Sequence, residues 1–212
     1  MHTAVVVGSS GAIGSAIAAG LREAGWALAP WLTPAGGRVE LTDAAAVDLA
    51  AAAIADRGPL GAVVYAAGLF DWADADRADP DVWSRLVEVN LTAAMRVSRR
   101  LLPALIAGAP STLVLLGSGA GLAAYPHNAA YVASKHGLAG FARATFLDVR
   151  DRGVRVTLIS PGLVAAGSGL ASGADPAALL QPADIAAAVR YVVDAPPHAC
   201  ITEIALQPLR RP

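Results

Sequence analysis

Tyr131 and Lys135 have the residue types and the spacing of a catalytic pair. Lys135 is the only lysine in the 212-residue chain, so apart from four histidines every other basic side chain is an arginine. On a helix, a spacing of four residues places the phenol and the ammonium on one face, one turn apart. An ammonium is a compact point charge, whereas a guanidinium is a wide planar fork. The pair is therefore the first candidate for chemistry in this sequence.

Three glycines near the N-terminus predict a dinucleotide site. Gly8 and Gly11 lie between the apolar run 4–7 and the small-residue segment 12–24, and Gly14 lies in the first turn of that segment. Glycines there permit a tight turn, close approach of the backbone to a pyrophosphate, and close packing of helix on strand. The following helix would direct its N-terminus at the negative charge. Because the turn directly follows a predicted strand and directly precedes a predicted helix, we expect a dinucleotide cofactor.

The end of the second predicted strand favours NADP(H) over NAD(H). NAD sites usually place an acidic residue there to bind the ribose hydroxyls. The segment from Ala29 to Thr33 contains no carboxylate that would repel a 2′-phosphate. Thr33 could bind that phosphate, as could Arg38 if the loop folds back. Arg38 as a solvated loop residue is an equally open interpretation.

The elements that must position these residues alternate along the whole chain. Apolar runs predict strands over residues 4–7, 26–31, 39–41, 62–66, 112–116, 154–159 and 201–206. Helical patterns cover residues 12–24, 80–106, 129–152 and 183–193, and Asp43 is placed to cap a further helix that ends near Arg57. Such alternation predicts a Rossmann-type doubly wound α/β fold, a parallel sheet with helices on both faces. The loop 33–37 is short, so the fold is shortened between strands 2 and 3. With no linker or repeat, residues 1–212 are expected to form one domain.

Composition excludes several other classes of function. Hydrophobic residues make up 55% of the chain and charged residues 16%, and the net charge is −1. A nearly neutral chain gives no reason to expect nucleic acid or an acidic membrane as a partner. The two long uncharged stretches are broken by proline and glycine, and no signal peptide is expected before the first strand. The single cysteine, Cys200, indicates a reducing, cytoplasmic setting. No metal site is expected, because no His, Cys or Asp cluster has ligand spacing.

The chain resembles the short-chain dehydrogenase/reductase family over nearly its full length. The glycine turn comes first, in the Gly-x-x-Gly-x-x-Gly spacing of the family's extended branch, and Tyr65-Ala66-Ala67-Gly68 is similar to the family's Asn-Asn-Ala-Gly element. Asn90 matches a helix asparagine, and Ser118 lies 13 positions before Tyr131. The pair Pro161-Gly162 then follows the sixth predicted strand. These motifs occur in the family's order and at fitting topological positions.

The resemblance implies a catalytic tetrad of Asn90, Ser118, Tyr131 and Lys135. Lys135 would lower the pKa of the Tyr131 phenol, since one cation about 4 Å away supplies roughly the 4 kcal/mol that three pKa units require. Lys135 would also hold the nicotinamide ribose, Ser118 would bond the substrate oxygen, and Asn90 would hold a water. The residues expected to bind the cofactor are Gly8, Ser10, Gly11, Ile13, Gly14, Thr33, Arg38, Leu41, Ala66, Ala67, Gly68, Asn90, Tyr131, Lys135, Pro161, Gly162 and Val164.

The implied activity is that of an NADP(H)-dependent carbonyl reductase or alcohol dehydrogenase. Its substrate would be a small hydrophobic or aromatic ketone or alcohol, because the residues expected around it are mostly apolar. Those residues are Leu69, Tyr125, His127 and Leu163, together with Phe70, Trp72 and Leu170. Trp72 could equally be a core residue, and His127 a solvated loop residue. The family resemblance also favours a homodimer or homotetramer.

Some positions depart from the family pattern. Ala166 stands where the family often has a threonine that anchors the nicotinamide carboxamide, and Ser168 is a candidate replacement. The C-terminus lacks the usual glycine-rich ending. Two alternatives therefore stay open: a dinucleotide-binding sensor or structural protein without redox turnover, and a dehydratase or isomerase that uses the same tyrosine.

Overall fold

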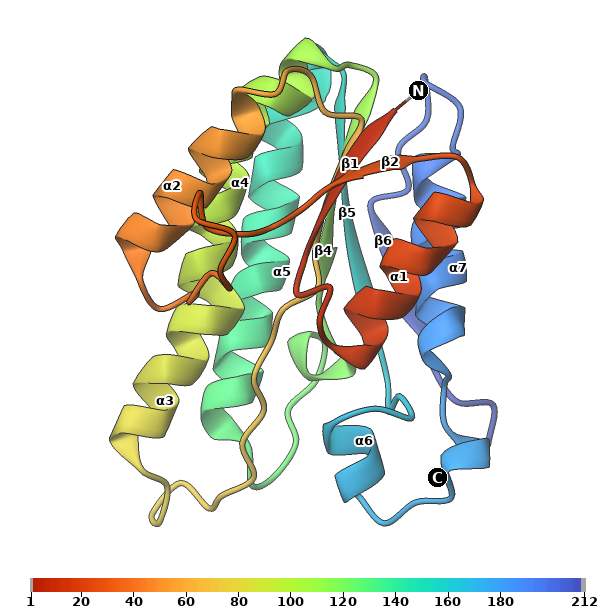
Figure 1. Cartoon of the computed structure of the whole chain (residues 1–212). Helices are drawn as coiled ribbons and strands as arrows, with labels where there is room; N and C mark the ends of the chain where they lie inside the picture. The colour runs from red at the N-terminus through yellow and green to blue at the C-terminus, as the bar shows by residue number, and fades with distance from the viewer. Residues whose placement is uncertain (1, 211–212) are drawn as a thin grey trace.

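A parallel sheet forms the centre of the computed structural model, which describes residues 2–210 (Figure 1). Its strand order is β2-β1-β3-β4-β5-β6, and every neighbouring pair is parallel. The strands are β1 (Thr3–Val7), β2 (Ala27–Ala29), β3 (Ala62–Tyr65), β4 (Ser111–Leu116), β5 (Val154–Pro161) and β6 (Glu203–Leu206). The central strands are fully buried and mostly apolar, which is the pattern of a sheet covered on both faces. The predicted doubly wound α/β fold is confirmed.

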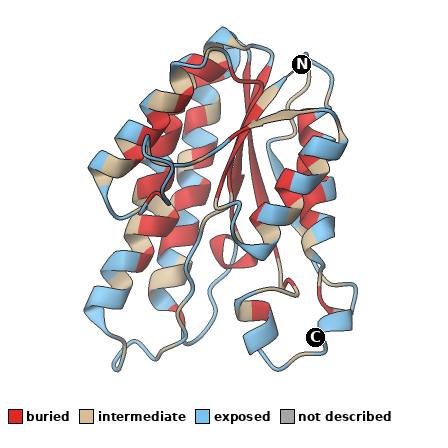
Figure 2. Cartoon of the chain, viewed as in Figure 1, coloured by how far each residue is buried: buried red, intermediate tan, exposed pale blue. Residues whose placement is uncertain are grey.

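Helices cover both faces of this sheet (Figure 1). On one face α1 (Ala12–Glu23) packs against α7 (Pro182–Val193), and on the other α2 (Ala44–Ala55) and α5 (Ala129–Val149) flank a long helical segment. The side chains of β1 alternate between two hydrophobic cores, with Val5 and Val7 in one and Ala4 and Val6 in the other. Figure 2 shows the buried residues concentrated on the sheet and on the helix faces that meet it.

The long helical segment consists of three consecutive parts. Asp79 caps α3 (Pro80–Val87), whose first position is the proline favoured there. A π-helical turn, Glu88–Thr92, interrupts the α-helical hydrogen bonding before α4 (Ala93–Ala107). A π turn is rare and often marks a functional position. The sequence predicted the helix over 80–106 but not this irregular turn.

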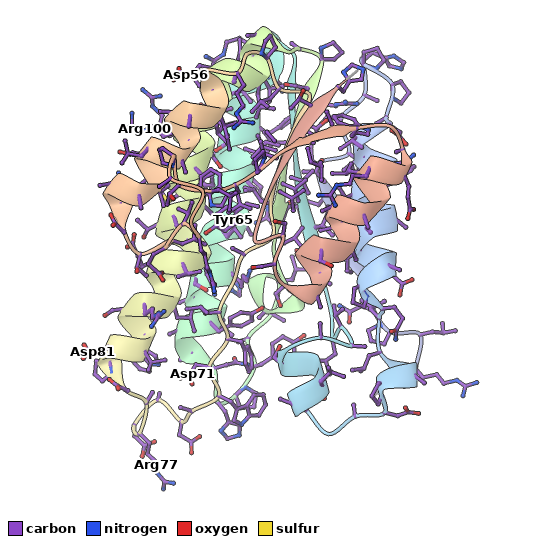
Figure 3. All side chains as sticks on the ribbon, in the orientation of Figure 1. Asp56, Tyr65, Asp71, Arg77, Asp81 and Arg100 are labelled. Atoms are coloured by element: carbon purple, nitrogen blue, oxygen red, sulfur yellow. The ribbon has the colours of Figure 1, made fainter. Side chains whose placement is uncertain are left out.

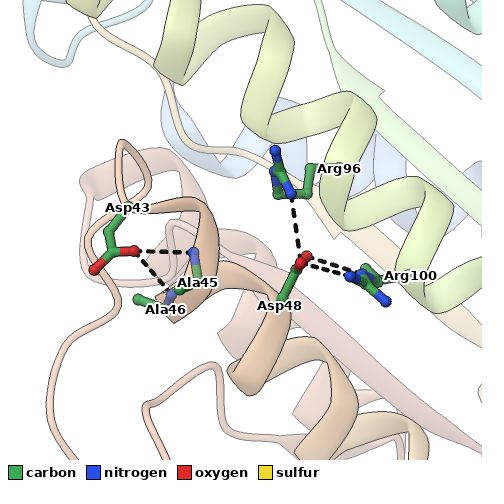
Figure 4. A network of polar contacts seen from close by, with 6 residues as sticks. All are labelled: Asp43, Ala45, Ala46, Asp48, Arg96 and Arg100. Atoms are coloured by element: carbon green, nitrogen blue, oxygen red, sulfur yellow. Dashed lines mark hydrogen bonds and ion pairs between the residues drawn. The ribbon is translucent and has the colours of Figure 1, made fainter.

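Polar contacts fix α2 against α4 (Figure 4). The Asp43 carboxylate accepts hydrogen bonds from the backbone N–H groups of Ala45 and Ala46, which confirms its predicted capping role. Further along α2, Asp48 accepts hydrogen bonds from Arg96 and Arg100 of α4. The helix over 44–55 is thus capped at its start and joined to α4 by two arginines at one residue, Asp48.

The segment from Pro30 to Asp43 contains neither helix nor strand, so the strand expected over 39–41 is wrong. Pro30 has no N–H to donate and ends β2 after three residues. Thr33 and Gly37 then close a tight loop through two mutual hydrogen bonds. Val39 is still buried in the core, so its side chain, rather than a strand ladder, fixes this segment.

The strands are parallel, so their carboxyl ends share one edge of the sheet, and the loops after β1, β3, β4 and β5 lie at its lower side in Figure 1. Short helices occur in these loops: the 3-10 turn Gly119–Gly121 after β4, and α6 (Ser168–Ala171) after β5. Doubly wound folds bind ligands outside this carboxyl edge. Among residues 2–210, no helix combines the length and the apolar character needed to span a membrane.

Candidate functional site

The glycine turn after β1 is fixed by backbone contacts that only glycine permits. Gly8 has φ of 90°, and a Cβ on it would lie 2.6 Å from the backbone nitrogen of Ala67. A Cβ on Gly14 would lie 2.2 Å from the Gly8 carbonyl oxygen. The turn therefore packs directly against the segment that follows β3, where Ala66 donates a hydrogen bond to Val7. Two predicted cofactor segments, 8–14 and 66–68, are brought together here.

The first turn of α1 has open N–H groups. Gly11 is its N-cap residue, and neither a capping side chain nor an acidic first-turn residue of the described chain serves it. A Cβ on Gly11 would meet only the Gly8 carbonyl oxygen, at an ordinary 3.6 Å. Ser10 beside it is exposed, while Ile13 is half-buried against the core between α1 and the sheet. Such a helix end suits a bound anion, so these residues fit the pyrophosphate of a dinucleotide.

Asn90 lies inside the π turn and is completely buried. Its Oδ1 accepts a hydrogen bond from the Leu69 N–H at 2.7 Å, and its Nδ2 donates to the Leu69 carbonyl at 2.9 Å and to Ser134 Oγ at 3.1 Å. Both amide hydrogens are thus used to join the loop after β3 to α5. The expected water-holding role of Asn90 stays a prediction, and the side chain is observed as a clamp.

Tyr65 contacts the π turn from the end of β3, and the sequence analysis did not predict this contact. The side chain points from the end of β3 into the helices (Figure 3), and its hydroxyl donates to the Val89 carbonyl at 2.6 Å. The residue is 1% exposed, and burial raises the pKa of its phenol. Its place directly before Ala66-Ala67-Gly68 is the only signal in the sequence that could have indicated this role.

Lys135 extends from α5 towards the end of β4. Its ammonium donates to the Leu116 carbonyl at 2.9 Å, and the residue is 4% exposed. Burial lowers the pKa of Lys135 from 10.5 to about 8. A Cβ built on Gly68 would lie 3.7 Å from this ammonium and 3.4 Å from Asn90 Oδ1. Gly68 therefore keeps a small space open between the two, which fits a site that holds hydroxyl groups or water.

Tyr131 lies one helical turn before Lys135, as predicted. The lysine nitrogen is 5.7 Å from the centre of the tyrosine ring. Burial raises the pKa of the Tyr131 phenol above its ordinary value, and a hydrogen bond with Ser118 only partly offsets that rise. The expected lowering by Lys135 is not seen in this structure, because loss of water around the phenol is the dominant effect. Ser118 Oγ also accepts the Ala120 N–H at 3.1 Å.

Aromatic side chains extend from Tyr131 to the surface. Phe70 meets the Tyr131 ring edge-on at 4.9 Å between centroids, Trp72 lies 6.1 Å from Phe70, and His127 lies 5.4 Å from Trp72. Trp72 is 64% exposed, so it is not a core residue. His127 has φ of 60° and contacts the Asp74 carboxylate through Nδ1. Of the other residues expected around the substrate, Leu69 and Tyr125 are exposed, whereas Leu163 is half-buried.

The loop after β5 places Pro161, Gly162 and Val164 at the same edge. Pro161 ends the strand, and the Gly162 N–H donates to the Leu206 carbonyl at 2.7 Å. Val164 is buried, and its neighbours Leu163 and Ala165 bond to Leu180. Ala166 and Ser168 follow in the same loop and are half-buried, so both are accessible to a ligand, and the role of Ser168 as a replacement stays a prediction.

The remaining predicted cofactor residues lie between β2 and α2. Thr33 uses its hydroxyl to accept the Gly37 N–H at 2.9 Å, Arg38 is exposed, and Leu41 packs half-buried against the core. The sequence analysis did not consider Glu40, whose carboxylate accepts hydrogen bonds from Thr42. Those bonds, aided by the charges of Arg85 and Arg38, lower the pKa of Glu40. This acidic group lines a hollow of about 650 Å³ with Arg85 and with Glu88, the first residue of the π turn that carries Asn90.

No group of three metal-ligating side chains lies close together within residues 2–210. The site therefore consists of hydroxyl, phenol, amide and ammonium groups at the carboxyl edge. Such a set can polarise a carbonyl oxygen and move a proton at it.

Known proteins resemble this chain in sequence and in structure. A family model described as short chain dehydrogenase matches residues 34–175. A glycine betaine reductase of Emericella nidulans is 28% identical over 99% of this chain and 19% of its own length, and an NAD-dependent oxidoreductase of Mycobacterium tuberculosis is 36% identical over 49% of this chain and 38% of its own. The chain thus spans about a fifth to two fifths of these curated relatives. An alcohol dehydrogenase from the archaeon Thermococcus sibiricus, solved with 5-hydroxy-NADP, superposes with a TM-score of 0.90 at 25% identity, covering 100% of this chain and 99% of that one.

Proposed function

Because the chain belongs to the short-chain dehydrogenase family, we propose that it is an NAD(P)-dependent oxidoreductase acting on carbonyl and alcohol groups. One observation carries the proposal: Ser118, Tyr131 and Lys135 meet at the carboxyl edge of the sheet, beside a glycine turn with an open helix N-terminus. A nicotinamide dinucleotide, when bound, supplies or accepts the hydride. The protein's own residues then have to orient the substrate and handle the proton.

Each residue of the tetrad has a task that its surroundings suit. Ser118 donates a hydrogen bond to the substrate oxygen, where negative charge develops during reduction. Tyr131 gives that oxygen its proton, and a phenol kept protonated by burial is ready for this direction. Lys135 supplies positive charge next to the phenol, and Asn90 holds Leu69 and Ser134 so that the two walls of the site keep their spacing.

Replacement of Tyr131 by Phe tests the proposal. We expect kcat to fall by about 10³-fold, because the proton donor is lost, while the dissociation constant of the dinucleotide changes less than about twofold. Cofactor absorbance measured with a panel of ketones and alcohols gives the rate, and fluorescence titration gives the affinity. Tyr191→Phe on the exposed face of α7 is the control. Turnover retained in Tyr131→Phe would rule out the assignment, whereas dinucleotide binding without any turnover in the unchanged protein would favour a sensor.

We propose NADP(H) as the preferred cofactor. Residues 29–33 offer no carboxylate to the ribose hydroxyls, and the exposed guanidinium of Arg38 follows a few residues later. The archaeal alcohol dehydrogenase with the similar fold was solved with an NADP derivative.

Replacement of Arg38 by Ala tests this preference. It should lower kcat/KM for NADPH about tenfold, the effect of one charge-assisted hydrogen bond, and leave NADH within about twofold. Arg152→Ala, at an exposed site after α5, should change neither. Equal loss with both cofactors, or a wild-type preference for NADH, would contradict the NADP(H) assignment.

We also propose that the substrate is a hydrophobic or aromatic carbonyl compound. Phe70 contacts the Tyr131 ring directly, and Leu69 and Trp72 add exposed apolar surface along the same wall. A ligand that covers these side chains would remove apolar area from water, worth about 25 cal/mol per Å².

A further inference from the structure

The side chain of Gln207 lies between the loops that follow β4 and β5. A Cβ built on Gly162 would be 2.5 Å from Gln207 Oε1, and one built on Gly119 would be 3.7 Å from Gln207 Nε2. Gly119 directly follows Ser118, and Gly162 directly follows Pro161. The carboxamide, carried in at the end of β6, thus lies beside the segment that holds the catalytic serine.

The Tyr125 hydroxyl approaches the same point. It would lie 3.5 Å from the Cβ of a residue at 119, close to the distance for Gln207 Nε2. Tyr125 is 50% exposed and Gln207 is also exposed, and neither side chain forms a hydrogen bond with another described residue. Gln207 also lines a surface hollow of about 540 Å³ with residues of the segment before α7 and of the C-terminal segment, so its side chain reaches the surface. Two polar groups therefore converge, unpaired, on the space over Gly119.

We propose that Tyr125 and Gln207 form a polar subsite for a second oxygen atom of the substrate, an inference that rests on the proposed oxidoreductase function. Both groups can donate a hydrogen bond, so the subsite suits an acceptor such as a ketone, ester or carboxyl oxygen. Gly119 directly follows Ser118, so a substrate held by Ser118 would bring its neighbouring atoms close to this subsite. The favoured substrate class is therefore a ketone that carries a second carbonyl function nearby.

The two glycines have different roles around this subsite. A side chain at 162 would collide with the Gln207 carboxamide, so Gly162 makes room for Gln207. At 119 the surrounding atoms are at ordinary contact distances of 3.5 to 3.9 Å, so the protein itself would tolerate a methyl group. The space over Gly119 thus has room for about one methyl group, bordered by the Tyr125 hydroxyl, Gln207 Nε2 and the Pro161 carbonyl oxygen.

A matched pair of substrates tests the subsite: ethyl acetoacetate, which has a second carbonyl oxygen, and 2-heptanone, which has the same chain length without it. With NADPH, Gln207→Leu should lower kcat/KM for ethyl acetoacetate about tenfold, mainly through KM, as expected for one hydrogen bond. The value for 2-heptanone should stay within about twofold. Tyr125→Phe, which removes one exposed hydroxyl, should act in the same direction. The double variant should lose less than the two single losses combined, because both groups bind one oxygen.

Several results would overturn the subsite. Equal losses with both ketones would make Gln207 a structural wedge, and weaker NADPH binding in Gln207→Leu would make it a cofactor contact. If the wild-type protein reduced neither ketone, the proposed function would be in question, and ligand-observed NMR with NADPH present would then decide the subsite separately. Tighter binding of ethyl acetoacetate than of 2-heptanone, lost in Gln207→Leu, would support it. Equal binding would refute it.

Discussion

Lys135 carries its ammonium group into a region almost closed to water. Its one hydrogen-bond partner among the described residues is the Leu116 carbonyl, and none of their carboxylates forms an ion pair with it. In the folded protein burial lowers the pKa of Lys135 from 10.5 to about 8. Below about pH 8 the group is charged in both states, so the folded state bears the full desolvation cost. Between about 8 and 10.5 the unfolded chain binds more protons, so stability rises with pH.

Replacement of Lys135 by Met should therefore stabilise the protein in the absence of cofactor. The depressed pKa corresponds to about 3 kcal/mol, and loss of the bond to Leu116 takes back about 1 kcal/mol, which leaves a gain of about 2 kcal/mol at pH 7. Urea unfolding at pH 7 and pH 9.5 measures it, and the gain should shrink at the higher pH. An equal destabilisation at both pH values would show that the buried ammonium carries no such cost. The same variant should lose turnover.

Tyr131 and Lys135 could be paired from the sequence by their spacing, and the family resemblance adds Asn90 and Ser118, but the energetics of these residues could not be predicted. Tyr131 and Lys135 lie one turn apart as a four-residue spacing requires. The rise in the Tyr131 pKa depends on how deeply the phenol is covered. The three bonds of Asn90 depend on Leu69, 21 residues before it, and on Ser134, 44 residues after it. Burial and long-range partners are set by the tertiary fold, which no local pattern encodes.

At the scale of elements, two glycines at the junction of β1 and α1 have different roles: Gly14 is needed for packing, and Gly11 faces the expected ligand. Gly14→Ala should destabilise the protein by about 3 kcal/mol, since its Cβ would press on the Gly8 carbonyl oxygen. Gly11→Ala should change stability by less than about 0.5 kcal/mol, because nothing in the protein is closer than 3.6 Å, yet weaken dinucleotide binding at least about tenfold. Thermal unfolding and fluorescence titration distinguish the two. Full cofactor affinity in Gly11→Ala would place the pyrophosphate elsewhere.

Helices and strands could be predicted where the apolar pattern and the flanking residues agreed. The prediction failed where a strand had no neighbouring strand to pair with. The helix over 44–55 begins after Asp43 as expected, since the capping signal is local. The strand expected over 39–41 does not form, although its apolar pattern is real. Val39 is buried, but β2 stops at Ala29 and offers no partner there. An apolar pattern predicts burial, whereas a strand also needs a neighbour.

At the scale of the whole molecule, two hydrophobic cores share one sheet. Residues of β1, β3, β4 and β5 contribute to both cores, so neither core can be lost without exposing strands that belong to the other. The position of Gln207 depends on the arrangement of the whole sheet. Its side chain meets the loops after β4 and β5 only because β6 pairs in parallel with β5.

We therefore predict a single cooperative unfolding transition for residues 1–212. Tryptophan fluorescence and far-ultraviolet circular dichroism should give coincident urea curves, because backbone and core are lost together. NADP⁺ at about a hundredfold excess over its dissociation constant should shift both curves together by about 2.7 kcal/mol. Two separate transitions, or a shift in only one signal, would mean that the chain contains independent units.

The π turn at Glu88–Thr92 has a consequence for how this helix tolerates changes in length. A π turn accommodates one residue more than an α turn, so the segment behaves as a regular helix with a single insertion. Deleting one residue there would restore an unbroken helix and keep α3 and α4 in register, but would remove the widened turn from which Asn90 projects. Asn90 would then lose its aim at Leu69. The shortened chain would fold with a more regular helix, but Asn90 would be misplaced. The π turn is therefore itself a part of the site.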